Sequence, residues 1–201
     1  GKTAAKEPRY PTVAVSDAFM AGCSFFAAFS AWQTLRIAAL GFFSVGCACS
    51  SGVLRFGFSP DVFRPYNETL AKFAGRVGIP MIGLGFAAGV PALQAYLQNL
   101  DNITPTIIVM LSLGFACSLQ WSETIEELYT TIVSGAAMIT ILTQGYLSGS
   151  NEVIIGAVAF VLGGLAVGAD RHSCLLGVRR ENLFHYILGS SFLAMTRSNL
   201  I

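Results

Sequence analysis

Residues 12–31 read TVAVSDAFMAGCSFFAAFSA, an apolar stretch whose one ionisable side chain is that of Asp17. A helix needs about 20 mostly apolar residues to cross the hydrocarbon core of a bilayer, and this stretch has that length. Comparable stretches follow at about residues 34–54, 70–97, 103–121, 123–147, 153–169 and 182–195. We therefore predict an all-α, polytopic integral membrane protein with about seven transmembrane helices joined by short loops.

Two of these stretches leave the number of spans open. The third contains Pro80 and Pro91, and it is either one long helix or a short amphipathic helix followed by a span that begins near Gly78. The last, residues 182–195, is short and either crosses the bilayer or lies in its interface. The second alternative for the last stretch would leave six spans.

The composition of the whole chain also favours a membrane protein. Of its 201 residues, 54% are hydrophobic and 11% are charged, whereas charged residues make up about 25% of a soluble domain. These values exclude a disordered chain, a nucleic-acid-binding protein and an ordinary soluble domain. After a basic N-terminal tail, residues 1–11, the spans use almost the whole chain, so residues 12–201 are predicted to form a single transmembrane domain.

The basic residues are distributed unevenly between the two sides that seven spans would define. One side carries ten of them: Lys2, Lys6, Arg9, Arg55, Arg64, Lys72, Arg76, Arg171, Arg179 and Arg180. The other side carries Arg36 and Arg197. Because cytoplasmic loops are enriched in Lys and Arg, we expect the N-terminus to be cytosolic, or in the matrix of a mitochondrion, and the C-terminus to face the opposite side. The pattern does not indicate which organelle.

Few ionisable residues fall inside the predicted spans, and all of them lie toward the inner leaflet. They form a candidate polar cluster: Asp17, Glu126, Glu127, Asp170 and His185. Intramembrane ionisable residues are a usual sign of function, but interfacial side chains that reach the headgroups would give the same pattern. Both interpretations stay open. The predicted middle of the bilayer carries no charge, which disfavours an ion path through the centre.

Motifs for catalysis and for metal or cofactor binding are missing from the sequence. It has no HExxH, GxSxG or Walker pattern, and its five Cys contain no C-x-x-C pair. The only histidines are His172 and His185, and no Lys lies in a predicted span, which excludes a retinal Schiff base. We therefore expect no catalytic residue, no metal site, no cofactor and no nucleic-acid partner.

Glycines in two predicted spans are spaced for close helix packing. Gly85 and Gly89 form one small-xxx-small pair, and Gly164 and Gly168 form another. Small residues let membrane helices approach closely, either within one chain or across a dimer face. The two glycine-rich segments also resemble each other in composition, which raises the alternative of an inverted repeat of the kind found in transporters.

Residues 156–171, which read GAVAFVLGGLAVGADR, resemble the penultimate helix of the YhhN-type lysoplasmalogenase family. The family is also similar in its short-looped helices and in a final helix with an aromatic residue near its start, here Tyr186 beside His185. The resemblance implies a shared helical fold and hydrolysis of a vinyl-ether lipid. However, Gly163 and Gly164 stand where the family has a Ser-Asp pair, so the acid and base that this chemistry requires have no evident counterpart.

Three functions are consistent with these features. The first is a non-catalytic polytopic protein that packs against other membrane subunits, or against its own copies, in a complex within the bilayer. The second is a small-solute transporter or channel. The third is an integral-membrane lipid hydrolase related to the lysoplasmalogenases. The first is favoured because the sequence combines glycine packing faces and short loops with few carboxylates.

Overall fold

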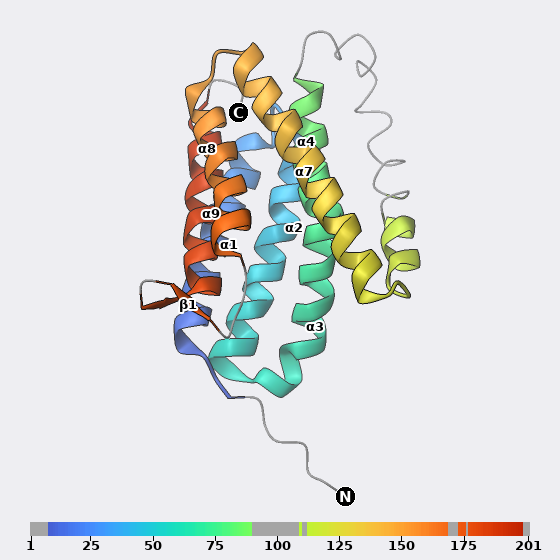
Figure 1. Ribbon diagram of the computed structural model, residues 1–201, viewed down its shortest axis with the longest axis vertical. Helices are drawn as coiled ribbons and strands as arrows, with labels where there is room; N and C mark the ends of the chain where they lie inside the picture. The colour runs from blue at the N-terminus through green and yellow to red at the C-terminus, as the bar shows by residue number, and fades with distance from the viewer. Residues whose placement is uncertain (1–7, 90–108, 110–111, 169–172, 176, 199–201) are drawn as a thin grey trace, which may run out of the picture.

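The computed structural model describes residues 8–89, 109, 112–168, 173–175 and 177–198. This part of the chain is a bundle of helices with one short hairpin (Figure 1). The first half contains α1 (Pro11–Ala31), α2 (Arg36–Val53), η1 (Leu54–Phe58), α3 (Pro60–Phe73), η2 (Ala74–Gly78) and α4 (Ile79–Ala88). The second half contains α7 (Glu123–Leu147), α8 (Asn151–Leu162), η3 (Gly163–Val167), β1 (Cys174–Leu175), β2 (Val178–Arg179) and α9 (Arg180–Thr196). The all-α class predicted from the sequence is confirmed.

The three η segments are π-helical turns that extend α2, join α3 to α4 and extend α8. Each widens the helix by one residue per turn, a distortion that is often found at functional sites. The second of them, η2, ends at Gly78, two residues before Pro80. Because proline cannot donate to the carbonyl four residues earlier, a widened turn here lets the chain continue as one long helix from α3 into α4.

Four helical segments in the described residues are long and apolar enough to cross a bilayer: Pro11–Ala31, Arg36–Phe58, Pro60–Ala88 and Glu123–Leu147. Asn151–Val167 is a shorter apolar helix. The fold is therefore compatible with a membrane location. The fourth predicted span, residues 103–121, lies partly outside the described residues, of which 109 and 112–118 are helical, and the total of seven spans stays a prediction.

Residues 55–69, which lie between the second and third predicted spans, are helical except for Ser59. The helix of α2 continues through η1 to Phe58, and α3 begins at Pro60. Proline suits this first helical position because its fixed φ matches the helix and its missing N–H is not needed there. The third helical segment therefore begins ten residues before the predicted position at Leu70.

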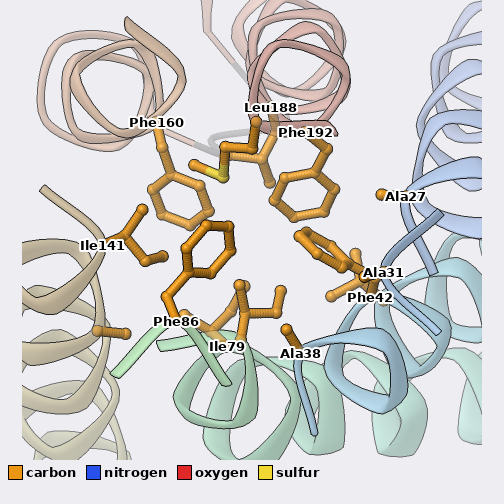
Figure 2. Close-up of a cluster of buried hydrophobic side chains, with 14 of the residues drawn as sticks. Ala27, Ala31, Ala38, Phe42, Ile79, Phe86, Ile141, Phe160, Leu188 and Phe192 are labelled. Atoms are coloured by element: carbon orange, nitrogen blue, oxygen red, sulfur yellow. The ribbon is translucent and has the colours of Figure 1, made fainter. Parts of the chain in front are cut away.

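Aromatic and aliphatic side chains fill the centre of the bundle (Figure 2). Phe42 from α2 meets Phe192 from α9 edge-on, with 4.8 Å between ring centroids, and Phe160 from α8 stacks on Phe192 at 6.3 Å. Phe86 from α4 and Ile141 from α7 point into the same cluster. Ala27 and Ala31 of α1 lie at the edge of this cluster, so six helices are joined there by apolar contact.

Close contacts show which helices are neighbours. A Cβ added at Gly83 would lie 2.6 Å from the Cβ of Ala137, so α4 and α7 lie side by side. Phe19 packs against Tyr186, where α1 and α9 run in the same direction. The starts of α1, α7 and α9 therefore share one end of the bundle with the ends of α2 and α8 (Figure 1). We call this the basic end, because the described basic residues other than Arg36 and Arg197 lie on the elements that meet there.

Candidate functional site

Asp17 and His185 meet at the basic end, where α1 packs on α9. The carboxylate of Asp17 is almost fully buried, and its Oδ1 lies 3.2 Å from Nδ1 of His185. Ser16 Oγ lies 3.2 Å from the same nitrogen, donates to the carbonyl of Val13 at 2.9 Å and lies 3.3 Å from Oδ1 of Asn182. The structure thus brings two of the five candidate cluster residues together and adds two neutral polar side chains to them.

A glycine on α2 makes room for this carboxylate. A Cβ at Gly52 would overlap Oδ2 of Asp17 and would lie 2.7 Å from its Cγ. Any larger residue at this position would therefore displace the carboxylate. Three helices, α1, α2 and α9, together determine where Asp17 lies.

A second polar group joins α2 to α3 at the same end. The Arg55 side chain is 2% exposed, and its Nη1 donates to Oδ1 of Asn67 at 3.1 Å and lies 3.4 Å from Oε1 of Glu68. The Asn67 amide donates in turn to the carbonyl of Ala48 at 3.3 Å and to Ser51 Oγ at 3.2 Å. Arg55, which follows the second predicted span, is thus enclosed between two helices.

A third group joins η2 to the start of α7. Arg76 is also 2% exposed, and its guanidinium forms an ion pair with Oε1 of Glu126. Lys72 Nζ lies 3.1 Å from the other carboxylate oxygen of Glu126. Nη1 of Arg76 donates to the hydroxyl of Ser118 at 2.6 Å and to its carbonyl at 3.0 Å. Glu126 is therefore part of an interhelical clamp rather than a neighbour of the Asp17 pair.

The predicted cluster is therefore divided by the packing of the helices. Glu127 is exposed on α7, and Asp170 lies outside the described residues. The start of α7 and the start of α9 lie on opposite sides of the bundle (Figure 1). Asp17 with His185 and Glu126 with Arg76 consequently form two separate sites.

The Asp17 group lacks the geometry of a nucleophilic relay. In a Ser-His-Asp triad, the serine and the carboxylate bind different nitrogens of the imidazole, so that one nitrogen takes the serine proton while the carboxylate orients the ring and stabilises the imidazolium. Here Ser16 and Asp17 both approach Nδ1 of His185. The arrangement suits a hydrogen-bonded tie between α1 and α9.

No group of three or more His, Cys, Asp or Glu side chains suited to a metal ion occurs in the part of the chain that the structure describes. The Asp17 pair is one carboxylate and one imidazole, and the other two groups are centred on guanidinium cations. Guanidinium groups donate hydrogen bonds and do not ligate metals. These donor sets suit ion pairing between helices.

Gly85 in α4 and Gly89, which follows α4, both lie at helix contacts. A Cβ at Gly85 would lie 2.5 Å from the Cβ of Ala38 on α2, and one at Gly89 would lie 2.9 Å from Nε2 of Gln144 on α7. Contacts closer than 3.0 Å are essentially never made by real Cβ atoms. At Gly85 the backbone of α4 thus approaches α2 more closely than alanine would allow, whereas at Gly89 the flexible end of Gln144 could move.

The other glycine pair has a different setting. A Cβ at Gly164 would meet no described heavy atom within 4 Å, and Gly168 ends η3 with a φ of 66°. That left-handed conformation is one that glycine adopts without the steric cost of a side chain. The two glycine-rich segments therefore differ in structure, since one is a packed α-helix and the other is a π turn and its end.

Sequence reasoning missed the burial of Arg55 and Arg76. Both arginines were counted as evidence for the inner side, yet each is enclosed beside an amide or a hydroxyl from another helix. Asn67 is not among the candidate residues of the sequence, but its buried side chain accepts a hydrogen bond from Arg55. The nearest signal in the sequence is the isolated arginine at the end of an apolar stretch, which needs a partner if that stretch is packed.

No family model, curated protein or solved structure matches the chain. The functional inference therefore depends on the geometry of the bundle and of its basic end.

Proposed function

We propose that this chain is a non-catalytic, multi-pass membrane protein that packs as a subunit against another transmembrane helix in a membrane complex. The observation that carries the proposal is the exposure of α7. In the most apolar stretch of 18 residues in α7, only 17% is buried against the rest of the bundle. The corresponding stretches of the other three long helical segments are 56–61% buried. One apolar helix of the bundle thus presents most of its surface outward.

Four large residues of this outward surface lie along one side of α7. Leu128, Ile132, Ile139 and Tyr146 are 60–78% exposed and follow one another at intervals of four, seven and seven residues, which places them on one side of a helix. Gly135 lies between them, and a Cβ there would meet no described heavy atom within 4 Å. A glycine notch flanked by larger apolar side chains is typical of contacts between membrane helices. We call these five residues the α7 outer face.

The remaining features favour packing over catalysis or conduction. The described centre of the bundle is occupied by phenylalanine and aliphatic side chains, which leaves no polar route along it (Figure 2). Several ionisable groups of the basic end pair with each other, as Arg76 does with Glu126 and Asp17 does with His185. Such pairs offset the cost of charge in the membrane and tie helices together.

The proposed orientation places the basic end on the cytosolic or matrix side. Seven described basic residues lie on elements that meet there, whereas Arg36 begins α2 and Arg197 follows α9 at the opposite end (Figure 1). Positive charge is enriched on the inner side of membrane proteins. This asymmetry supports an inner N-terminus and an outer C-terminus, as the sequence predicts.

Photocrosslinking in intact membranes tests the α7 outer face. A photoreactive amino acid is placed at Ile132, and a matched control is placed at Phe29, which is 83% exposed on α1. We expect a discrete protein adduct from position 132 and lipid adducts from position 29. An adduct of twice the mass of this chain would identify a second copy as the partner, and any other discrete mass would identify another subunit.

A bulky substitution provides the second arm. Gly135→Leu fills the notch without meeting described atoms, so it should abolish the adduct at position 132 and leave the melting temperature of the isolated chain unchanged. Lipid adducts alone at position 132, or the same protein adduct from both positions, would contradict the proposal.

A second candidate function, small-solute transport, is favoured by one observation. Asp17 is a buried carboxylate within a segment that is long and apolar enough to cross a membrane, and such residues often serve proton or substrate binding. In that case the Asp17–His185 pair would line the inner half of a path. Loss of transport in Asp17→Asn with unchanged stability would favour this function over packing.

A further inference from the structure

A second feature of the basic end lies where the β1–β2 hairpin meets the start of α1. Arg179 ends β2, and its guanidinium carbon lies 4.3 Å from the centre of the Tyr10 ring. Tyr10 is itself held in place, because its N–H donates to the carbonyl of Phe56 at 3.0 Å and its ring lies 6.3 Å from that of Phe56. The aromatic ring covers one face of the guanidinium, and this cation–π contact orients the group.

Two further arginines flank this contact. Arg9 directly precedes Tyr10 and is exposed. Arg180 follows Arg179, and its Nη2 donates to the carbonyl of Ala166 in η3 at 3.0 Å, which anchors the side chain across the hairpin. Its Nε is a buried donor with no hydrogen-bond partner among the described residues. Three arginines from two parts of the chain, Arg9 beside Tyr10 and the adjacent Arg179 and Arg180, thus lie at one corner of the bundle.

The charges at this corner differ from those elsewhere at the basic end. Arg55 and Arg64 pair with Glu68, and Lys72 and Arg76 pair with Glu126. By contrast, no carboxylate of the described residues forms a salt bridge with Arg9, Arg179 or Arg180. The carboxylate next in sequence, that of Glu181, is buried. Among the described carboxylates, none therefore compensates the positive charge at this corner through an ion pair.

The hairpin adds an apolar surface beside these charges. Leu175 and Val178 are opposite each other in the two strands and are 38% and 41% exposed. Gly177 makes the turn between them with a φ of 79°. Exposed aliphatic side chains next to arginines match a phospholipid, which has an anionic headgroup beside apolar acyl chains. A soluble anion has no acyl chain that would contact Leu175 and Val178.

We propose that Arg9, Arg179 and Arg180 bind the phosphate of an anionic phospholipid of the inner leaflet, with Leu175 and Val178 against its acyl chains. Guanidinium groups bind phosphate through paired N–H donors, and arginine surpasses lysine in this role because its donors are planar. Basic pockets next to membrane helices on the inner side are suited to anionic headgroups. The proposal rests on the membrane placement proposed above, and it assigns this corner a ligand rather than a protein partner.

Native mass spectrometry of the purified full chain tests the site directly. The protein in detergent is titrated with phosphatidylglycerol and, in parallel, with phosphatidylcholine of the same acyl chains. We expect tighter binding of phosphatidylglycerol. Arg9→Gln and Arg179→Gln should each weaken it about fivefold, since a basic residue near an anionic surface contributes about 1 kcal/mol. Binding of phosphatidylcholine should not change.

Arg64→Gln is the matched control, because Arg64 lies at the same end and is exposed but already pairs with Glu68 at 2.8 Å. It should leave the affinity for phosphatidylglycerol unchanged. Melting temperatures of all variants in the same detergent separate loss of binding from loss of fold. Arg179→Lys, which keeps the charge but not the planar donors, should retain part of the affinity.

Three results would overturn the proposal: equal affinity for the two lipids, an equal loss in Arg64→Gln, or full displacement of the lipid by glycerol phosphate at a concentration similar to that of the lipid. The last would assign the corner to a soluble phosphate compound. Because lipid selectivity is measured on the isolated chain, it can fail while the α7 crosslink succeeds, and the reverse also holds.

Discussion

Replacing Gly85 by alanine should separate α2 from α4. The added Cβ would lie 2.5 Å from the Cβ of Ala38 and 2.9 Å from its Cα, whereas ordinary contacts begin at 3.4 Å. The obstacle is backbone and a Cβ rather than the end of a flexible side chain, so the two helices have to move apart by about 1 Å. Overpacking of this kind costs about 1–3 kcal/mol. For a chain of this size, about 2 kcal/mol lowers the melting temperature by about 4–8 °C.

Gly135→Ala provides the matched control for this substitution. It makes the same chemical change within a helix of the same bundle, but its Cβ meets no described heavy atom within 4 Å. Thermal melting of both variants in one detergent, followed by circular dichroism, gives the comparison. We expect Gly135→Ala to melt at or above the temperature of the unmodified chain. Equal melting temperatures for both variants would refute the close approach of α2 and α4 and the packing derived from it.

Three further substitutions test the groups at the basic end. Asp17→Asn keeps a hydrogen-bonding side chain beside His185 and should lower the melting temperature by a few degrees; an unchanged value would show that the pair does not hold α1 to α9. Gly52→Ala should destabilise the chain more than Asp17→Asn does, because its Cβ overlaps the carboxylate, and the same melting assay ranks the two. A double-mutant cycle of Arg76→Gln and Glu126→Gln should give a coupling energy of about 1–3 kcal/mol, whereas additive effects would contradict a direct ion pair.

Apolar length was enough to locate most of the helices. The predicted stretch at 123–147 has the same bounds as α7, and the stretch at 12–31 begins one residue after α1 does. This agreement has a physical basis, since a helix that crosses a membrane must satisfy its own backbone hydrogen bonds over a fixed thickness of apolar surroundings. A run of about 20 apolar residues leaves few other conformations.

The same reasoning failed for residues 55–69. Their polar side chains favoured a loop between two spans, whereas the segment is helical except for Ser59. Arg55 and Asn67 are polar but bind each other across two helices, so the segment is helical although many of its residues are exposed. A sequence shows that a charged residue needs a partner but not which residue supplies it. The partner lies 12 positions away and depends on the turn at Ser59.

The prediction of the candidate polar cluster was limited for a similar reason, because the sequence does not show which helices are neighbours. Depth in the membrane follows from position along a helix, and on that basis Asp17 and Glu126 both belong near the inner leaflet. Which helices are neighbours does not follow from depth. Because α1 packs on α9 while α7 packs on η2, Asp17 meets His185 and Glu126 meets Arg76.

The most direct measurement determines which side of the membrane each end of the bundle faces. Single-cysteine variants are prepared with native Cys174 in the hairpin or with Ser148→Cys in the turn after α7, both positions being exposed. Intact cells or organelles are treated with a membrane-impermeant thiol reagent before and after permeabilisation. We expect Ser148→Cys to react at once and Cys174 only after permeabilisation. Labelling of both before permeabilisation, or recovery of the chain in the soluble fraction, would contradict a membrane-spanning bundle whose basic end faces inward.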